Sequence, residues 1–253
     1  WNATDPSLHS ATSMTIGIFL PYGLGDLVMA TPMLRALRRH VGPETRLVGI
    51  TRPQLIPVLQ GTHWLDEQWA LDPQSHTRTS RDWALVRRIH RERFDTVLFL
   101  PQSFRATVLA WLGGARRRVG YVRHGGGKLL TDRLSWPHRL PAASRYSLVD
   151  HYYRLAQAIG CPIDSTQLEL ATTERDQRRA EDAWKTLGIR ADGRVVALNP
   201  TGAGGTAALW PAAYFAQLAR RLAVEADHDV VVLCGARQRQ IANDIARQAG
   251  HPR

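Results

Sequence analysis

The amino-acid sequence predicts an α/β fold made of two Rossmann-like units. Short runs of β-branched and other apolar residues alternate with longer stretches of helical period, a pattern typical of parallel strands joined by helices. At 253 residues, the chain is long enough for one large domain or two small ones. Its 44% hydrophobic and 22% charged residues are close to the globular average, which excludes a disordered chain and a disulfide scaffold.

The first part of the chain contains four strand candidates and four helical faces. The expected strands are residues 15–20, 46–50, 96–100 and 118–122. Apolar residues at helical spacing lie between and after them. These faces are Leu27, Ala30, Leu34 and Leu37; Leu85, Val86 and Ile89; Phe104, Val108, Trp111 and Leu112; and Leu148, Tyr152, Leu155 and Ile159. The segment Gly160-Cys161-Pro162 is expected to end the last of these helices.

A second unit is expected to begin after residue 162. The polar residues 163–172 lead to Thr173, a residue type that suits the start of a helix. The elements after it are strands 194–198 and 229–234 and helices around Phe215 and Ile241. We therefore expect an N-terminal unit over residues 1–162 and a C-terminal unit over residues 163–253. Because two strands do not close a stable sheet, we expect the second unit to be incomplete and the chain to be a fragment of a longer protein.

Positive charge is concentrated in the first part of the chain. Residues 1–160 contain 21 basic and 11 acidic residues, whereas residues 161–253 contain 12 and 11, within a total net charge of +11. We expect the first part to meet nucleic acid, a phosphorylated glycolipid or an anionic membrane surface; an evenly solvated basic surface is the alternative. No run approaches the roughly 20 apolar residues of a membrane span, and Cys161 and Cys234 are expected to be reduced, so we expect a cytosolic chain.

Two glycines and a carboxylate follow the first expected strand. Gly23 and Gly25 permit a tight turn and a close backbone approach at the carboxyl end of the strand, where ligands bind in open α/β sheets. Asp26 is either the N-cap of the next helix, which the chemistry alone favours, or a general base facing a neutral hydroxyl. The third glycine of a dinucleotide fingerprint is replaced by Val28, so this turn gives little support for NAD binding.

A second glycine-rich segment spans residues 199–206, directly after an expected strand. Its backbone amides and threonine hydroxyls are suited to hold a diphosphate, and Pro211 suits the first turn of the next helix. A loop anchored by Trp210 is the alternative. The basic run 116–128 is suited to phosphates or RNA, or forms a solvated rim. Lys128 is followed by Leu129, so this run is not a P-loop, and the histidines lack the spacing of a metal site.

Five segments, in order along the chain, resemble one known family. The first is Gly25-Asp26-Leu27-Val28-Met29-Ala30-Thr31-Pro32-Met33-Leu34-Arg35-Ala36-Leu37. The others are Arg118-Val119-Gly120-Tyr121 with residues 129–132, the helix 151–156, Asn199-Pro200 with Trp210-Pro211, and residues 231–235. These segments resemble glycosyltransferase family nine, the ADP-heptose:lipopolysaccharide heptosyltransferases. The resemblance implies a GT-B fold with two Rossmann-like domains, the acceptor-binding one over residues 1–162 and the nucleotide-sugar-binding one over residues 163–253. It also implies Asp26 as the catalytic base.

The resemblance also implies the substrates and their contacts. We expect an inverting, metal-independent transfer of a heptose or related sugar from a nucleotide-diphosphate sugar, such as ADP-heptose, to the lipopolysaccharide core. No cofactor is expected. The expected acceptor-binding residues are Gly23, Gly25, Arg123 and Lys128. The expected donor-binding residues are Thr201, Gly202, Gly204, Gly205, Thr206 and Trp210. We expect a monomer without nucleic acid, peripheral at the cytoplasmic side of the inner membrane and in contact with anionic lipid.

The chain departs from the family pattern at the donor site. Two residues before Trp210 the family usually has a lysine that grips the diphosphate, and here Ala208 stands there. Residues 236–239 read Ala-Arg-Gln-Arg where an acidic residue usually holds the ribose. The family's Asp-Ser-Gly or Asp-Thr-Gly segment is expected beyond Arg253. The alternatives to a transferase are a non-catalytic nucleic-acid or anionic-lipid binding module and a nucleotide-dependent oxidoreductase.

Overall fold

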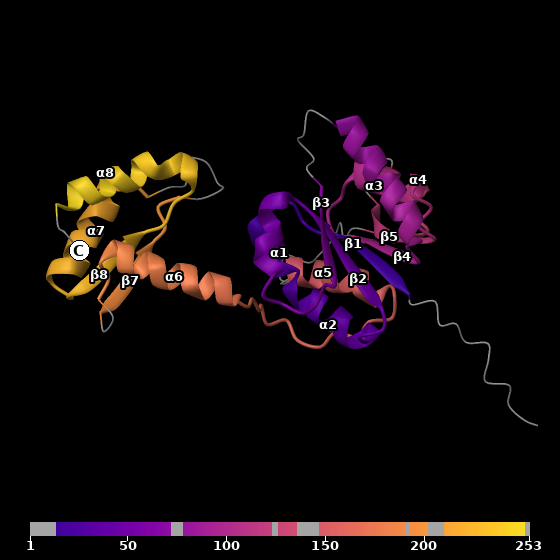
Figure 1. Ribbon diagram of the computed structural model, residues 1–253, viewed down its shortest axis with the longest axis horizontal. Helices are drawn as coiled ribbons and strands as arrows, with labels where there is room; N and C mark the ends of the chain where they lie inside the picture. Colours follow the sequence, from indigo (N-terminus) through magenta and orange to yellow (C-terminus); the bar gives the residue numbers. More distant parts are fainter. Residues whose placement is uncertain are drawn as a thin grey trace, which may run out of the picture. The chain divides into compact units, whose positions relative to one another are not determined.

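The computed structural model divides the chain into two compact units, Trp1–Thr173 and Glu174–Arg253 (Figure 1). The residues that it describes are 14–71, 78–122, 126–135, 147–190, 193–201 and 210–250. Each unit is described by itself.

The first unit is built on a sheet of six parallel strands. Its order is β3-β2-β1-β4-β5-β6, and every neighbouring pair is parallel. The strands are β1 (Thr15–Phe19), β2 (Arg46–Thr51), β3 (Glu67–Ala70), β4 (Thr96–Phe99), β5 (Arg117–Val122) and β6 (Asp132–Ser135). This is the order of a doubly wound Rossmann sheet, in which the direction of winding reverses between β1 and β4.

Helices cover both faces of this sheet (Figure 1). They are α1 (Leu24–Met29), α2 (Thr31–Val41), α3 (Arg78–Glu92), α4 (Phe104–Leu112) and α5 (Leu148–Gln157), with the 3-10 helices η1 (Pro53–Leu59) and η2 (Gly126–Leu129). Alternate residues of β1 point to opposite faces: Ile16 and Ile18 pack with α1, α2 and α5, whereas Phe19 packs with α3 and α4. Two apolar cores therefore enclose the sheet, one on each face.

The four strands predicted in this unit are confirmed, and the two edge strands, β3 and β6, were not predicted. Each has only four residues, and their sequences, Glu-Gln-Trp-Ala and Asp-Arg-Leu-Ser, lack the β-branched runs of the central strands. Edge strands are exposed along one side, so they tolerate polar residues that a central strand does not.

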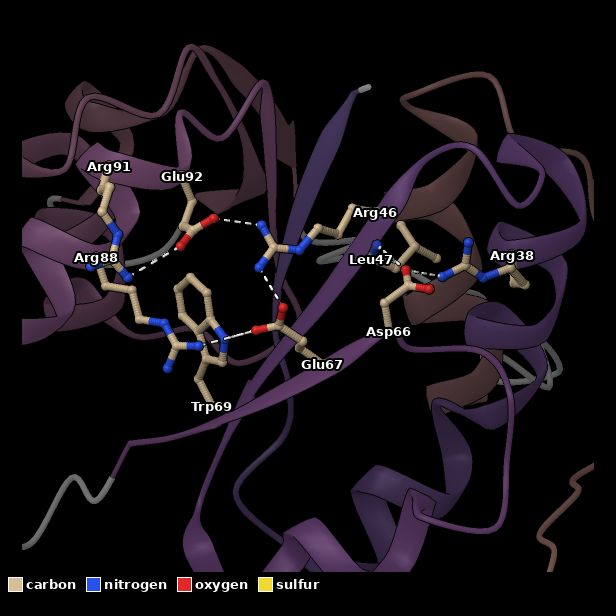
Figure 2. A network of polar contacts seen from close by, with 9 residues as sticks. All are labelled: Arg38, Arg46, Leu47, Asp66, Glu67, Trp69, Arg88, Arg91 and Glu92. Carbon is tan, nitrogen blue, oxygen red and sulfur yellow. Dashed lines mark hydrogen bonds and ion pairs between the residues drawn. The ribbon is translucent and has the colours of Figure 1, made fainter. Parts of the chain in front are cut away.

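Polar contacts attach edge strand β3 to its neighbours (Figure 2). Arg46 of β2 lies between Glu67 of β3 and Glu92 of α3 and donates to both carboxylates. Glu67 also accepts from the indole N–H of Trp69 at 2.8 Å, and the Arg88 guanidinium lies 3.8 Å from the centre of the Trp69 ring. These contacts hold the pKa of Glu67 below its usual value, the hydrogen bonds from Trp69 and Arg46 being the main cause.

Two helical faces differ from the sequence expectation. The face that begins at Leu27 is divided between α1 and α2, because Pro32 cannot supply a backbone donor at the start of α2. Helix α4 forms as predicted, but it buries Ala106, Leu109 and Ala110. Three residues of its predicted apolar face, Phe104, Trp111 and Leu112, are exposed instead.

The boundary between the units lies after Thr173, not after residue 162 as the sequence suggested. Residues 163–171 pack on the first unit because the buried Arg35 side chain of α2 binds them. Arg35 donates to the carbonyl oxygens of Ser165 and Gln167, at 3.3 and 3.2 Å, and to the Glu169 carboxylate at 2.7 Å. This polar segment is therefore packed on the first unit and is not a linker; we call residues 163–171 the strap.

The second unit contains a sheet of two parallel strands in its described residues. Its elements are α6 (Glu174–Leu187), β7 (Arg194–Leu198), α7 (Ala212–Val224), β8 (His228–Val232), η4 (Ala236–Gln238) and α8 (Arg239–Ala249). Both predicted strands and all three predicted helices are present. None of the helices within the described ranges is both long enough and apolar enough to cross a membrane.

Candidate active site

The carboxyl ends of β1 and β4 mark the place where the winding of the first sheet reverses. In open α/β sheets the loops on either side of this point diverge and leave a crevice for a ligand. Gly23, Gly25 and Asp26 follow β1, and Gln102 and Ser103 follow β4. The candidate site of the first unit is therefore built from these two loops.

Gly23 leaves room for the Asp26 carboxylate. Gly23 is the N-cap of α1, and a Cβ atom added to it would lie 3.0 Å from Oδ2 of Asp26. Most side chains at residue 23 would therefore push the carboxylate away. A Cβ on Gly25 would meet no atom within 4 Å, so the structure shows no steric requirement for glycine there.

The expectation that Asp26 caps a helix is wrong. The cap is Gly23, which makes no side-chain cap hydrogen bond, and Asp26 is the third residue of α1. The carboxylate is exposed and makes no hydrogen bond or ion pair to another described residue. The carboxylate oxygens are therefore available to a ligand, as the role of general base requires and the role of N-cap does not.

Tyr152 of α5 lies near Asp26, since α1 and α5 pack together. The phenol is buried, and burial, with a smaller contribution from the negative charge of Asp26, raises the pKa of Tyr152 above its usual value. The hydroxyl therefore stays protonated at neutral pH. From the sequence, Tyr152 was expected only as a core residue of its helix, because a tyrosine at apolar spacing carries no signal of a site.

His151, the neighbour of Tyr152, packs against the sheet. Its ring stacks on Tyr121 of β5 with 3.9 Å between ring centres, and the Tyr121 hydroxyl donates to the His151 carbonyl oxygen at 2.9 Å. Burial lowers the pKa of His151 to about 4. The imidazole is therefore neutral at physiological pH.

Two further groups at this edge were not predicted from the sequence. Arg52, directly after β2, donates to the Tyr22 carbonyl oxygen at 3.1 Å and lies over the Tyr22 ring. Its guanidinium brings a positive charge beside the Gly23 turn. Ser103 is the N-cap of α4 and lines a cavity of about 30 Å³ between the ends of β4 and β5, a volume that suits one water molecule.

The basic run 116–128 is not one continuous basic rim. Arg117 donates to Asp132 and to the Ala158 carbonyl oxygen, and Arg118 donates to the carbonyl oxygens of Ala115 and Leu129. These two arginines hold the fold together. Of the predicted acceptor-binding residues in this run, Lys128 is exposed on η2 and Arg123 lies outside the described residues.

The predicted donor site belongs to the second unit. Thr201 is described, and its backbone N–H and hydroxyl both donate to Oδ1 of Asn199, at 3.1 and 2.9 Å. Trp210 is half exposed and stacks on Tyr214 with 5.7 Å between ring centres. The remaining predicted donor residues, Gly202, Gly204, Gly205 and Thr206, lie outside the described residues. In the described parts of the chain no three His, Cys, Asp or Glu side chains are grouped as metal ligands.

Comparisons with known proteins give a consistent family match. The model of glycosyltransferase family 9 (heptosyltransferase) matches residues 82–251. Lipopolysaccharide heptosyltransferase 2 of Escherichia coli (strain K12) is 21% identical over 239 residues, which cover 92% of this chain and 66% of that protein. The chain thus spans just under two thirds of the length of this relative.

Solved structures share the fold. The glycosyl transferase family 9 protein of Veillonella parvula DSM 2008 superposes with a TM-score of 0.76 at 20% identity, over 94% of this chain and 66% of the other. The E. coli ADP-heptose lps heptosyltransferase II superposes with a TM-score of 0.73 at 20% identity, over 93% and 71%. The expected α/β fold with Rossmann-like units is confirmed by these likenesses.

Proposed function

Because the chain belongs to glycosyltransferase family 9 (heptosyltransferase), we propose that it transfers a heptose or a related sugar from a nucleotide-diphosphate sugar to the lipopolysaccharide core. The free carboxylate of Asp26, at the winding reversal of the first sheet, is the observation that carries this proposal. The similarity to an ADP-heptose heptosyltransferase favours ADP-heptose as the donor.

In the proposed reaction Asp26 is the general base. Its carboxylate removes the proton from an acceptor hydroxyl while the hydroxyl oxygen forms a bond to the anomeric carbon. The bond from that carbon to the diphosphate breaks on the opposite side, and the electron pair leaves with the nucleotide. Configuration at the anomeric carbon is therefore inverted.

The neighbours of Asp26 support this role. Tyr152 remains protonated and adds no second negative charge, and Arg52 places a positive charge near the turn for an anionic acceptor. We assign the departing diphosphate to the backbone amides of the 201–205 loop, a segment that lies largely outside the described residues. In this proposal hydrogen bonds, without a metal ion, stabilise the charge that develops on the leaving group.

Substitution of Asp26 tests the proposal. Asp26→Asn should lower kcat by about 10²-fold or more, as expected for loss of a general base, while ADP-heptose binding stays close to that of the parent. Transfer of radiolabelled heptose to lipopolysaccharide core from which the acyl chains have been removed measures kcat, and calorimetry measures donor binding. Activity should persist in a metal chelator.

Glu44→Gln is a matched control, because Glu44 is an exposed carboxylate of the same unit that lies in the turn before the amino end of β2, whereas Asp26 follows the carboxyl end of β1. It should leave kcat unchanged. Equal turnover by Asp26→Asn and the parent would exclude Asp26 as the base. Tight, salt-sensitive RNA binding without donor binding would instead favour the nucleic-acid module considered above.

A further inference from the structure

Helices α3 and α4 lie side by side on one face of the first sheet (Figure 1). An apolar groove runs between them. The groove has a volume of about 390 Å³. Trp83 of α3 and Phe104, Val108 and Leu112 of α4 line it, and Trp111 is exposed on α4 beside Leu112. We call these five residues the α3–α4 apolar face.

The α3–α4 apolar face is not required by the core. Helix α4 already buries Ala106, Leu109 and Ala110 against the sheet, yet Phe104 is 61% exposed and Trp111 is 50% exposed. On α3, Trp83 is 50% exposed, while Val86 and Ile89 supply the buried contacts. Large apolar side chains grouped in this way on a surface mark a site of interaction.

Two exposed basic side chains of α3 lie beside this face. Arg87 and Arg91 lie four and eight residues after Trp83, so all three occupy one side of α3, and both arginines are exposed. Arg91 also donates to Glu92 at 3.3 Å, but its side chain is 75% exposed, so the guanidinium is still accessible to an anionic partner. The acidic lining residue, Asp82, is neutralised by two hydrogen bonds from Arg105.

The same face reaches the edge of the candidate active site. Phe104 lines both the groove and the small cavity between the ends of β4 and β5. It directly follows Ser103, which caps α4 on that edge. A partner on the α3–α4 apolar face would thus lie close to the place where the proposed acceptor is held.

We infer that the α3–α4 apolar face docks on the surface of an anionic lipid bilayer. Exposed tryptophans with apolar neighbours and a basic rim are the composition of an interfacial membrane-binding surface. A second copy of the chain fits less well, because a two-fold contact would bring the two arginine rims together. The inference builds on the proposed function by presenting a lipid-linked acceptor to the Asp26 edge, but vesicle binding requires no sugar transfer.

Vesicle flotation tests the inference with the full chain. The parent should bind vesicles of phosphatidylcholine and phosphatidylglycerol, bind phosphatidylcholine alone much more weakly, and lose binding as salt rises. Trp83→Ser combined with Leu112→Ser should lower binding on the order of tenfold, because less apolar surface is buried in the lipid. Brominated lipid should quench the tryptophan fluorescence of the parent and quench the Trp83→Phe, Trp111→Phe variant less.

Charge variants provide a second measurement that does not depend on the aromatic residues. Arg87→Glu with Arg91→Glu should lower binding at least about fivefold for each charge reversed. The controls lie on α6: Trp184→Ser matches the aromatic change, and Arg175→Glu with Arg179→Glu matches the charge change, since all three residues are exposed. The control variants should bind as the parent does.

Several outcomes would overturn the inference. These are absence of binding by the parent, equal binding to vesicles with and without phosphatidylglycerol, and unchanged binding by the face variants. A dimer in light scattering that dissociates on Trp83→Ser, Leu112→Ser would assign the face to a second copy instead. Transfer to acyl-free acceptor should proceed at the parent rate in the face variants, so failure of docking is distinguishable from failure of the proposed activity.

Discussion

The Asp26 carboxylate is positioned by the shape of the chain around it and not by a hydrogen bond of its own. Gly23 leaves room for it, and α1 carries it at the third position of a six-residue helix. A base that accepts a substrate proton needs free oxygen atoms, and a capping carboxylate has already used one of them. The free oxygen atoms of Asp26 therefore fit the role of general base better than that of N-cap, the two roles that the sequence left open.

The buried imidazole of His151 leads to a prediction about stability at the scale of a single residue. Its pKa is about 4 in the folded chain and 6.5 when unperturbed, so the unfolded chain binds more protons between these pH values. The free energy of unfolding should therefore fall as pH drops from 6.5 toward 4, by at most about 3 kcal/mol from this residue. Urea unfolding across that pH range measures it.

His151→Phe is the informative variant for this prediction, because phenylalanine keeps an aromatic ring against Tyr121 and does not titrate. The parent should lose more stability than His151→Phe between pH 6.5 and 4. Carboxylates with lowered pKa, such as Glu67, contribute equally to both proteins and cancel in the difference. Parallel stability profiles would contradict the neutral, buried state of His151.

At the scale of elements, hydrophobic patterns predict what the core requires. The four central strands of the first sheet were found because both of their faces are buried, which produces continuous apolar runs. β3 and β6 were missed because pairing on one side and polar contacts stabilise them. For α4 the helix was predicted but its buried face was not, because apolar residues occupy both sides and periodicity cannot distinguish core from surface.

Sequence patterns also revealed only part of the candidate site. The Gly23 turn and Asp26 could be singled out as candidates from the sequence because glycine and a carboxylate after a strand are unusual residue types for a core. Tyr152 and Arg52 were not, because each reaches the site only through packing between distant segments. Side chains that come together only in the tertiary structure have no characteristic spacing along the sequence, so a single sequence does not reveal that they are neighbours.

The buried guanidinium of Arg35 contributes three of the contacts that hold residues 163–171, which leads to a prediction at the scale of elements. Arg35→Ala removes hydrogen bonds to Ser165, Gln167 and Glu169. Because these bonds involve a charged donor in a buried setting, their loss should cost about 2 to 3 kcal/mol of stability in the first unit. Limited proteolysis should then cut within residues 163–171 earlier than in the parent.

Arg39→Ala is the control for the strap. Arg39 lies on the same helix and pairs with Asp164 of the same segment, but its side chain is 65% exposed. Exposed ion pairs contribute about 1 kcal/mol or less, so this variant should resemble the parent in both measurements. Equal sensitivity of the two variants to protease would mean that Arg35 does not hold the strap.

At the scale of the whole molecule, the two units differ in how much core they bury. In the described residues the first unit contains clusters of 23 and 16 buried residues, one on each face of its sheet. The cluster of the second unit has five, Leu198, Ala216, Ala219, Ile245 and Ala249, and α6 has no buried residue. Alanine buries little apolar area, so the hydrophobic contribution to stability is much smaller in the second unit.

The last prediction follows from this difference. Chemical unfolding should proceed in two steps, with the second unit unfolding first and its stability at least about 3 kcal/mol below that of the first. Hydrogen exchange read by mass spectrometry can separate the steps, because the amides of β7 and β8 should exchange at denaturant concentrations where those of β1 and β4 stay protected. A fragment ending at Thr173 should keep the second transition of the parent unchanged. Exchange of all four strands in one step would show that the units fold as a single cooperative body, and the separate cores would then not set the stability of the chain.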